Sequence, residues 1–404
     1  MIPDSERTNA LRGLKVVECA TVVAAPLCGR LMADFGAEII HVEHPEKGDH
    51  LRQFGFAVDG INPWWKYYAR NKKLITLDIS KPKGRELLLR LLKGADIFIE
   101  NFRPGRLEEW GIRYEDLSGL NSRLIMVRVT GYGQSGPYMS QPGFGTLMEA
   151  MSGFAAMTGE ADRPPVLPQF ALADSFAGFY ATVATMFAIY HRDVVGTGKG
   201  QVIDVSIWES LYSMLGPNAL VYELTGEPPK RIGNRAPTSS PRNTYQTKEG
   251  RWVAIAGSTQ STAARLFAVM GRPELIEDPR FSTNMNRVKN VDALDEMVGK
   301  WMAEHALADI VDILRKNDVP VGPVYDIRDI IIDRHAKARE MVIESPDDDL
   351  GSLKMEGVFP KMSLTPGAVR HAGKRMGSDN EEIFIGRLGL SRAEVEELSK
   401  EGII

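Results

Sequence analysis

Short β-rich runs alternate with helical patterns along the first part of the chain, and this rhythm constrains the fold more than any other feature. Strand patterns at 14–20, 37–45 and 74–79, and later in DIFIENF and RLIMVRVTGYG, are separated by helical patterns such as 26–35 and 83–95. Parallel sheets with crossover helices are encoded in this way. We therefore expect a Rossmann-like open parallel sheet with helices packed against it.

The pattern changes after a long apolar helix predicted at 171–190, a strand at QVIDVSI and a helix that ends near 215. Residues 225–251 are rich in Pro, Gly, Arg, Asn and Ser, which indicates a domain boundary or a ligand-facing loop. A chain of 404 residues is also too long for one ordinary core. We expect a large domain from residues 1–222 with 330–404 and a small α+β domain from 223–329. The stretch 357–404, with strand and loop patterns and a final charged helix, should pack on the large domain.

Composition excludes several classes of function. The formal net charge of -4 argues against a nucleic-acid partner, because phosphate-binding surfaces leave a basic excess. The two cysteines, Cys19 and Cys28, cannot build a disulfide framework. The polar start MIPDSERTNALRG is unlike a signal peptide, and no apolar run is long enough to span a bilayer. We expect a soluble, cytoplasmic protein without a membrane partner.

The sequence does not contain the motifs expected for a dinucleotide cofactor or a metal site. The first strand-to-helix turn, CATVVAAP, lacks the three glycines of dinucleotide-binding folds, which argues against nicotinamide or flavin. The segment GYGQSG at 131–136 can be either a tight turn or a ligand-contacting loop. His41 and His44 are three apart on a predicted strand and should face opposite sides, so with His50 they do not form a metal site. We expect neither a metal nor a prosthetic group.

Asp174 is the residue that stands out among possible nucleophiles. The chain has no G-x-S-x-G motif, and neither cysteine has neighbours that would lower its pKa. Asp174 is the only acidic group in PQFALADSFAGFYATVATMFAIY. It could simply cap the following helix. Capping and reactivity are compatible, because backbone amides at a helix N-terminus would keep the carboxylate ionised and nucleophilic.

Basic residues cluster in loops beside the predicted sheet edge, where ligands bind in open α/β folds. Solvated surface charge and a nucleotide phosphate site both explain this cluster, which consists of Arg52, Arg70, Lys72, Lys73, Arg103 and Arg106.

Many ordered motifs resemble those of family III CoA-transferases, the formyl-CoA transferase and crotonobetaine CoA-transferase group, together with the related α-methylacyl-CoA racemases. The matches span nearly the whole chain and include FGAEIIHVEHPEKGD at 35–49, ARNKKLITLDI at 69–79, ENFRPG at 100–105, GYGQSGP at 131–137, ADSFAG at 173–178, GKGQVIDVSIWES at 198–210 and PVGPVYD at 320–326. The resemblance implies a large Rossmann-like domain from both chain ends, an inserted small domain, and two subunits interlocked like linked rings.

The resemblance also implies a chemistry. Asp174 occupies the place of the family's nucleophile, which would attack an acyl-CoA to give an acyl-aspartyl anhydride and then an aspartyl-CoA thioester. Acyl-CoA thioesters and carboxylic acids are then the substrates. The implied CoA contacts are His44, Arg52, Lys72, Lys73, Arg106 and Tyr132.

Two departures from the family bear on the substrate. Val23 stands where formyl-CoA transferase has a glutamine, and AGST at 256–259 replaces a loop of glycines, so oxalate is disfavoured as acceptor. Racemases resemble one another in a histidine where this chain has Phe144 and a glutamate near Thr259. Neither substitute carries a proton, so CoA transfer is preferred over the alternative of racemisation or epimerisation.

Three further questions stay open at this point. Succinyl-CoA is a frequent donor among relatives, and Arg235 or Arg242 could clamp the distal carboxylate of a dicarboxylic acid or instead form an interface salt bridge. The partner subunit could be identical or paralogous. A non-catalytic CoA-binding subunit of a heteromer and a nucleotide-binding regulatory protein are the other classes, and the presence of Asp174 argues against the first.

Overall fold

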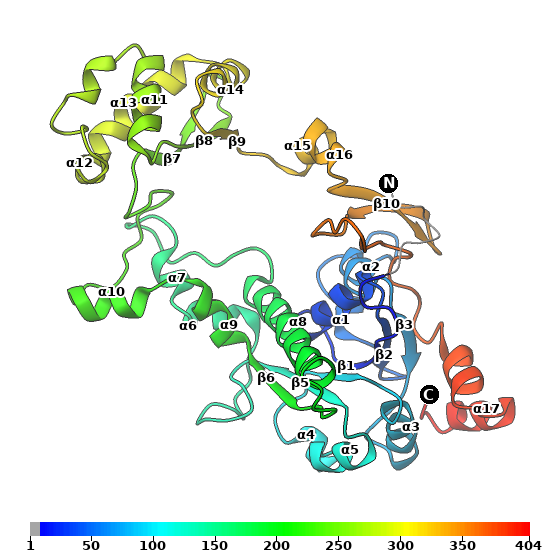
Figure 1. Cartoon of the computed structure of the whole chain (residues 1–404). Coiled ribbons are helices and arrows are strands. Elements are labelled where there is room, and N and C mark those ends of the chain that lie inside the picture. The colour runs from blue at the N-terminus through cyan, green and yellow to red at the C-terminus, as the bar shows by residue number, and fades with distance from the viewer. Residues whose placement is uncertain (1–8) are drawn as a thin grey trace. The chain divides into compact units, whose positions relative to one another are not determined.

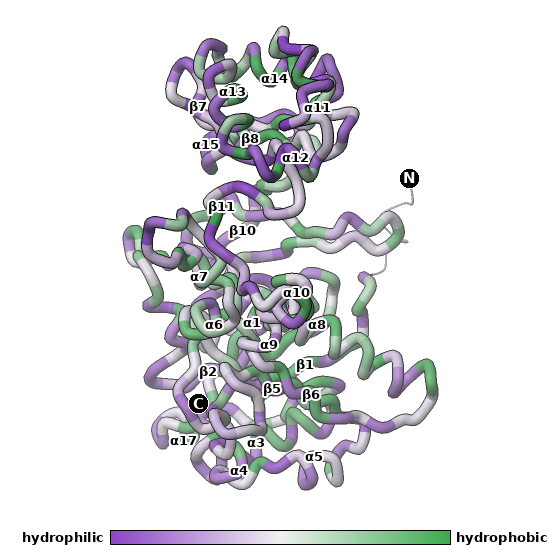
Figure 2. The backbone as a smooth tube through the Cα atoms, turned by 90° about the vertical axis from the view of Figure 1, so that its left-hand side faces the viewer, coloured by the Kyte–Doolittle hydropathy of each residue, from purple (hydrophilic) through white to green (hydrophobic). Residues whose placement is uncertain are grey.

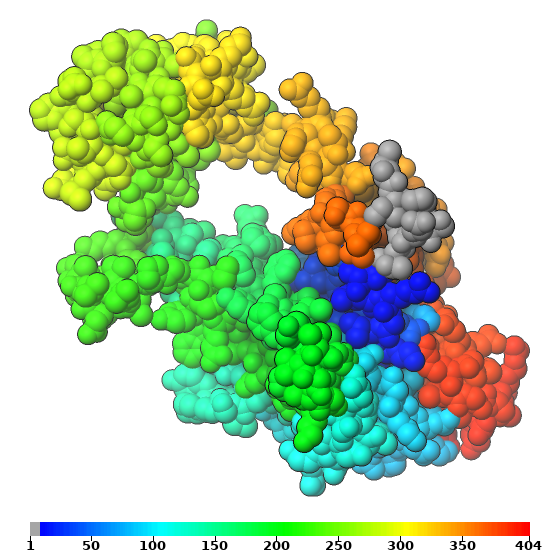
Figure 3. All heavy atoms as spheres, viewed as in Figure 1, coloured from blue at the N-terminus to red at the C-terminus, as the bar shows by residue number. Residues whose placement is uncertain are grey.

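Residues 9–404 are described by the computed structural model, and they form two compact units. The first unit contains residues up to 155, 167–220 and 338–404, and the second contains 156–166 and 221–337. The first unit therefore combines an N-terminal segment that begins at residue 9 with the C-terminal segment 338–404, as the adjoining blue and red atoms of Figure 3 show.

The first unit is built on a six-stranded sheet in the order β3-β2-β1-β4-β5-β6 (Figure 1). All neighbouring strands are parallel. Their bounds are β1 Lys15–Cys19, β2 Glu38–Glu43, β3 Lys73–Thr76, β4 Ile97–Glu100, β5 Ile125–Thr130 and β6 Val202–Ser206. The order is that of the doubly wound Rossmann fold, so the predicted fold class is confirmed.

Both faces of the sheet are buried, because successive side chains of each strand point to opposite sides. Val16 of β1 packs in one core cluster and Val17 in the other. Figure 2 shows hydrophobic residues following β1, β5 and β6. The helices and turns of this unit are α1 Ala24–Asp34, η2 His50–Gln53, α2 Pro63–Tyr68, α3 Pro82–Leu92, α4 Arg106–Glu109, α5 Tyr114–Leu120, α6 Gly145–Met151, α8 Leu172–Asp193, α9 Ile207–Met214, η4 Glu381–Arg387 and α17 Arg392–Lys400.

The C-terminal segment packs on the first unit, as expected: Phe384 and Ile404 belong to the same core cluster as Val17. One expectation for this segment was wrong. No strand forms within 357–404, where the chain instead makes loops, η4 and α17. A hairpin of β10 (Val342–Asp347) and β11 (Gly351–Glu356) precedes it.

Helix α8 is long and apolar enough, by length and composition alone, to cross a membrane, and it is the one such helix within 9–404. In the first unit it packs against α1, α9 and strands β5 and β6. One face of α8 therefore packs on the first unit, whereas another face exposes Val183, Phe187 and Tyr190.

The second unit has a three-stranded antiparallel sheet in the order β7-β8-β9. Helices pack on it around a separate core that contains Phe267 and Phe281. The strands are β7 Arg242–Gln246, β8 Trp252–Ala256 and β9 Val321–Pro323, and the helices are α11 Gln260–Val269, η3 Pro273–Ile276, α12 Asn284–Lys289, α13 Val291–Glu304, α14 Leu307–Lys316 and α15 Ile327–Ile332. Short helices α7 (Phe154–Met157), α10 (Asn218–Thr225) and α16 (Arg334–Ala338) lie where the chain passes between the units.

Candidate active site

A cavity of about 250 Å³ opens at the carboxyl edge of the six-stranded sheet. Its walls are the loops after β1, β4 and β5, the start of α6 and the first turn of α8. The strand order reverses between β1 and β4, and ligands of open α/β folds bind at such a switch point. Asp174 lines this cavity, and so do three other predicted site residues, Val23, Tyr132 and Phe144.

Asp174 is the third residue of α8 and lies in its first turn. It does not cap the helix: the N-cap residue is Ala171, which makes no side-chain cap hydrogen bond. Burial, and then the negative charge of Glu149, raise the pKa of Asp174 to about 6. The expectation that helix amides would favour its ionised form is therefore wrong.

The backbone N–H groups at the start of α8 do not donate hydrogen bonds to Asp174, because they donate to Glu149 of α6 instead. Its Oε1 accepts hydrogen bonds from the backbone N–H groups of Leu172, at 3.0 Å, and Ala173, at 3.2 Å. Glu149 is buried, with 3% of its surface exposed. Sequence reasoning missed this residue, because a glutamate in an amphipathic helix carries no signal of a contact 23 residues away.

Gly145, one helical turn before Glu149, allows α6 to approach the nucleophile candidate closely. A β-carbon added at Gly145 would lie 2.3 Å from Oδ2 of Asp174. Residue 145 therefore has no room for a side chain while Asp174 keeps its position.

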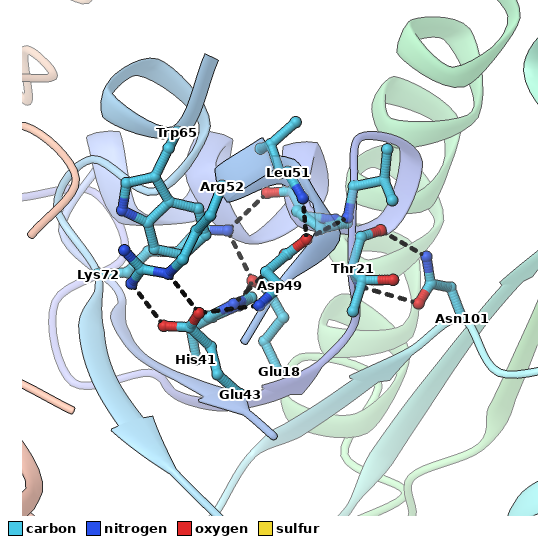
Figure 4. Close-up of polar contacts among 12 residues, drawn as sticks. Glu18, Thr21, His41, Glu43, Asp49, Leu51, Arg52, Trp65, Lys72 and Asn101 are labelled. Atoms are coloured by element: carbon cyan, nitrogen blue, oxygen red, sulfur yellow. Dashed lines mark hydrogen bonds and ion pairs between the residues drawn. The ribbon is translucent and has the colours of Figure 1, made fainter. Parts of the chain in front are cut away.

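The turn after β1 forms another wall of the cavity and is held from two sides (Figure 4). The Asn101 side chain accepts from the N–H of Thr21 at 3.0 Å and donates to its carbonyl at 2.8 Å. Asp49 Oδ1 accepts from the N–H of Val22 at 3.0 Å. Val22 has φ of 68°, a left-handed conformation that is strained for a β-branched residue. These contacts fix the strained turn next to Val23.

A buried ionic cluster supports this turn from beneath (Figure 4). Glu18 Oε1 accepts from Lys72 Nζ at 2.6 Å and lies 2.6 Å from His41 Nδ1. Lys72 and His41 keep the pKa of Glu18 below its ordinary value although burial opposes them. His41 Nε2 in turn lies 3.6 Å from Asp49 Oδ2. The cluster thus links the sheet to the Val22 turn.

The predicted CoA contacts differ in how much surface they offer. Lys72 is 1% exposed and engaged with Glu18, and Arg52 makes a bidentate ion pair with Glu43. Lys73 begins β3 and pairs with Glu38 and Glu382, which places it at the amino edge of the sheet, opposite the cavity.

Three predicted contacts keep exposed surface at the carboxyl edge. His44 follows β2 with 33% of its side chain exposed, and Arg106, with 52%, begins α4 after β4. Tyr132 lies against Tyr138 and Trp208 in the cavity wall. Arg103, which the sequence placed in the basic cluster but not among the implied CoA contacts, lines the cavity as well.

In the second unit, the two candidate clamp arginines are bound differently. Arg235 is engaged by Asp292 and Asp295, each at 2.7 Å. Arg242 donates only to the carbonyls of Asn234 and Arg235, and no ion pair within 9–404 includes it. Of the two arginines, Arg242 is therefore the one without a carboxylate partner among residues 9–404.

The described part of the chain contains no site suited to catalysis by a cysteine thiolate or by a metal ion. Cys19 and Cys28 are buried free thiols, and burial raises the pKa of both, that of Cys28 to about 12. Residues 9–404 contain no group of three or more His, Cys, Asp or Glu side chains that could hold a metal ion. What the cavity offers is an ionisable carboxylate, partly buried and without a hydrogen-bond donor among residues 9–404, which is suited to nucleophilic attack.

The chain is similar to known CoA-transferases. The sequence pattern of CoA-transferase family III matches residues 11–380. The chain is 40% identical to succinyl-CoA–D-citramalate CoA-transferase of Chloroflexus aurantiacus over 98% of both chains, and 37% identical to the β subunit of that organism's succinyl-CoA–L-malate CoA-transferase, again over 98% of both. The crystal structure of a CAIB/BAIF family protein from Brucella suis has a TM-score of 0.83 at 33% identity and covers 94% of this chain and 100% of its own.

Proposed function

Because the chain belongs to CoA-transferase family III and is an enzyme that acts on CoA thioesters, we propose that it moves CoA between carboxylic acids through covalent intermediates on Asp174. The observation that carries this proposal is the Asp174 carboxylate, which lines the cavity at the switch point of the sheet and is not held by any donor in residues 9–404.

The proposed reaction proceeds by four acyl transfers. An Asp174 oxygen attacks the thioester carbonyl, CoA leaves as a thiolate, and an acyl-aspartyl anhydride forms. The thiolate attacks the Asp174 carbonyl, releases the donor acid as a carboxylate and leaves an aspartyl-CoA thioester. The acceptor carboxylate then attacks this thioester and displaces CoA thiolate, which finally attacks the acceptor's carbonyl in the new anhydride. The new acyl-CoA leaves and Asp174 is regenerated.

The pKa of Asp174 suits this cycle. A carboxyl group with a pKa of about 6 is mostly ionised at neutral pH and more basic than an ordinary aspartate. Partial burial limits the access of water, which would otherwise hydrolyse the anhydride.

For the substrates we propose succinyl-CoA as donor and a dicarboxylic acid as acceptor. The two Chloroflexus relatives are named for succinyl-CoA and for D-citramalate or L-malate, which are dicarboxylic acids. Arg242 is the better candidate clamp for the distal carboxylate, because Arg235 already binds two aspartates. We keep His44, Arg106 and Tyr132, which have exposed surface, as the preferred CoA contacts.

Arg242→Ala tests the clamp. The variant should lose roughly 10- to 100-fold in kcat/KM for dicarboxylic acceptors, because a charge-assisted hydrogen bond is lost, and should keep its rate with monocarboxylic acids. Arg235→Ala is the comparison and should affect stability more than acceptor preference. An unchanged preference in Arg242→Ala removes the clamp from the proposal.

We further propose that the enzyme is an intertwined dimer, either of identical chains or with a paralogous subunit, and that it works in the cytoplasm. Helix α10 supports the assembly: none of its residues is buried, and it exposes Leu220, Tyr222 and Leu224. Such an apolar helix is normally covered by a partner. The two named subunits of the L-malate enzyme are a precedent for a heteromer. The mass of the purified chain in solution tests the dimer, and a monomer with full activity contradicts it.

Asp174→Asn tests the function itself. Exchange of labelled succinate into succinyl-CoA should fall by about 10⁶-fold, as in a protease that loses its nucleophile. Asp193→Asn, at the other end of α8, is the matched control and should keep full exchange. Full exchange by Asp174→Asn refutes the proposed function.

A further inference from the structure

The start of α8 is capped by a residue from another helix. The first N–H groups of any helix lack acceptors within the helix. Ala171, at the N-cap position, has no side-chain oxygen to accept from these N–H groups, and Glu149 of α6 accepts from the first two amides of α8 instead. A buried carboxylate is costly unless it is hydrogen-bonded, so this contact explains why Glu149 is tolerated at 3% exposure.

The same contact determines the surroundings of Asp174. An aspartate in the first helical turn usually gains from nearby amides and from the helix dipole. Here Glu149 already occupies the amides of Leu172 and Ala173, and Gly145 on the same face of α6 lies directly against the Asp174 carboxylate. Asp174 therefore lines the cavity without a competing donor from the described residues 9–404.

We propose that Glu149 is a positioning residue for the nucleophile: it holds the first turn of α8 and keeps the amides of that turn from Asp174, so that the Asp174 carboxylate stays free and basic. The inference rests on the proposed function, because it gives Glu149 a role only through Asp174. No relative's name assigns this role.

The negative charge of Glu149 supports the same role for this residue. Glu149 is the neighbouring charge that raises the pKa of Asp174 after burial itself. The other titratable groups that face Asp174 are Tyr68 of α2, whose own pKa is raised to about 12 by burial first, and the cavity-lining His50, Arg103 and Tyr132. His50 and Arg103 can only favour the ionised carboxylate, so removing the charge of Glu149 must lower the pKa of Asp174.

Glu149→Gln separates charge from capping, because the amide oxygen of glutamine can still accept from both N–H groups. With a pKa of about 6, the wild-type enzyme should retain about one tenth of its plateau kcat/KM at pH 5. The Gln variant should retain clearly more than one tenth at pH 5, and its plateau value should be several-fold lower because the nucleophile is less basic.

Two companion variants keep the result interpretable. Glu249→Gln makes the same change at α14, where Glu249 accepts from the N–H of Leu307 at 2.8 Å, and should leave the pH profile unchanged. If Glu149→Gln folds poorly, adding Ala171→Ser supplies the helix with its own capping hydroxyl. The double variant should then regain its melting temperature and keep the displaced pH profile.

The outcomes are distinct. An acidic limb that stays at its wild-type pH in the folded Glu149→Gln protein, while Asp174→Asn is inactive, overturns the role of Glu149 and leaves the proposed function intact. Full recovery of the wild-type pH profile by Ala171→Ser also overturns it, because Glu149 would then act as a structural cap only. Activity in Asp174→Asn overturns the proposed function instead.

Discussion

Gly145→Ala should inactivate the enzyme without unfolding it. The added β-carbon would lie 2.3 Å from Oδ2 and 2.9 Å from Cγ of Asp174, about 1 Å closer than ordinary contact. The obstructing atoms are the end of a side chain, so the Asp174 carboxylate can move aside at little cost in stability. A displacement of about 1 Å at the reacting atoms costs about 10²-fold in rate, because the attack geometry is lost.

The assay is kcat/KM for CoA transfer together with thermal unfolding. Gly145→Ala should lose about 10²-fold in kcat/KM and keep or slightly raise its melting temperature, since alanine favours a helix over glycine by roughly 0.5–1 kcal/mol. Gly119→Ala is the matched control, because Gly119 also lies in a helix and a β-carbon there meets nothing within 4 Å. Full activity in folded Gly145→Ala refutes the reasoning, and loss of activity through unfolding alone does so as well.

Three further outcomes follow from the structure. Asp174→Asn should be more stable than the wild type at pH 7.5 by at most about 3 kcal/mol, because a carboxyl pKa raised to about 6 makes its ionisation unfavourable in the folded state as pH rises from about 4 to 6. Urea unfolding at pH 7.5 and 3.5 checks this, and an equal gain at both values contradicts it. Lys72→Met should destabilise the protein by about 3–5 kcal/mol, because Glu18 would stay buried without its ion pair. A stable variant with only a raised KM for CoA would show instead that Lys72 is a ligand contact. Val22→Gly should be neutral or stabilising in thermal unfolding, since glycine relieves a strain of order 1–3 kcal/mol, whereas Val23→Gly at a buried position should cost about 2 kcal/mol or more. Comparable losses in the two variants would argue against strain at Val22.

The six-stranded sheet was predictable because the sequence pattern of each strand and helix is local. Buried parallel strands such as Val16–Val17 and Ile39–Ile40 read as apolar runs, and the helices between them repeat with helical spacing. Asp174 stands out in the sequence for a similar reason, as a single charge in an apolar segment, and the structure places it in the cavity wall. The strand expected within 357–404 failed because that stretch lies over the first unit through isolated side chains such as Phe384 rather than through a paired strand.

The environment of Asp174 was not predictable, because it depends on contacts between distant segments. Glu149 is far in sequence from the first amides of α8, yet it accepts the hydrogen bonds that these amides could otherwise donate to Asp174. The burial of Lys72 likewise depends on its pairing with Glu18, 54 residues away. A basic residue in a loop sequence looks the same whether it faces a phosphate or a buried carboxylate.

The central claim is that Asp174 becomes covalently joined to acyl and CoA groups during turnover. Peptide mapping by mass spectrometry, after incubation of the enzyme with succinyl-CoA and then hydroxylamine or borohydride, tests it most directly. The peptide containing Asp174 should carry a hydroxamate or a reduced side chain at that residue, and the same peptide of Asp174→Asn should carry neither. An unmodified Asp174 in an enzyme that is turning over, or a modification at another residue, would contradict it.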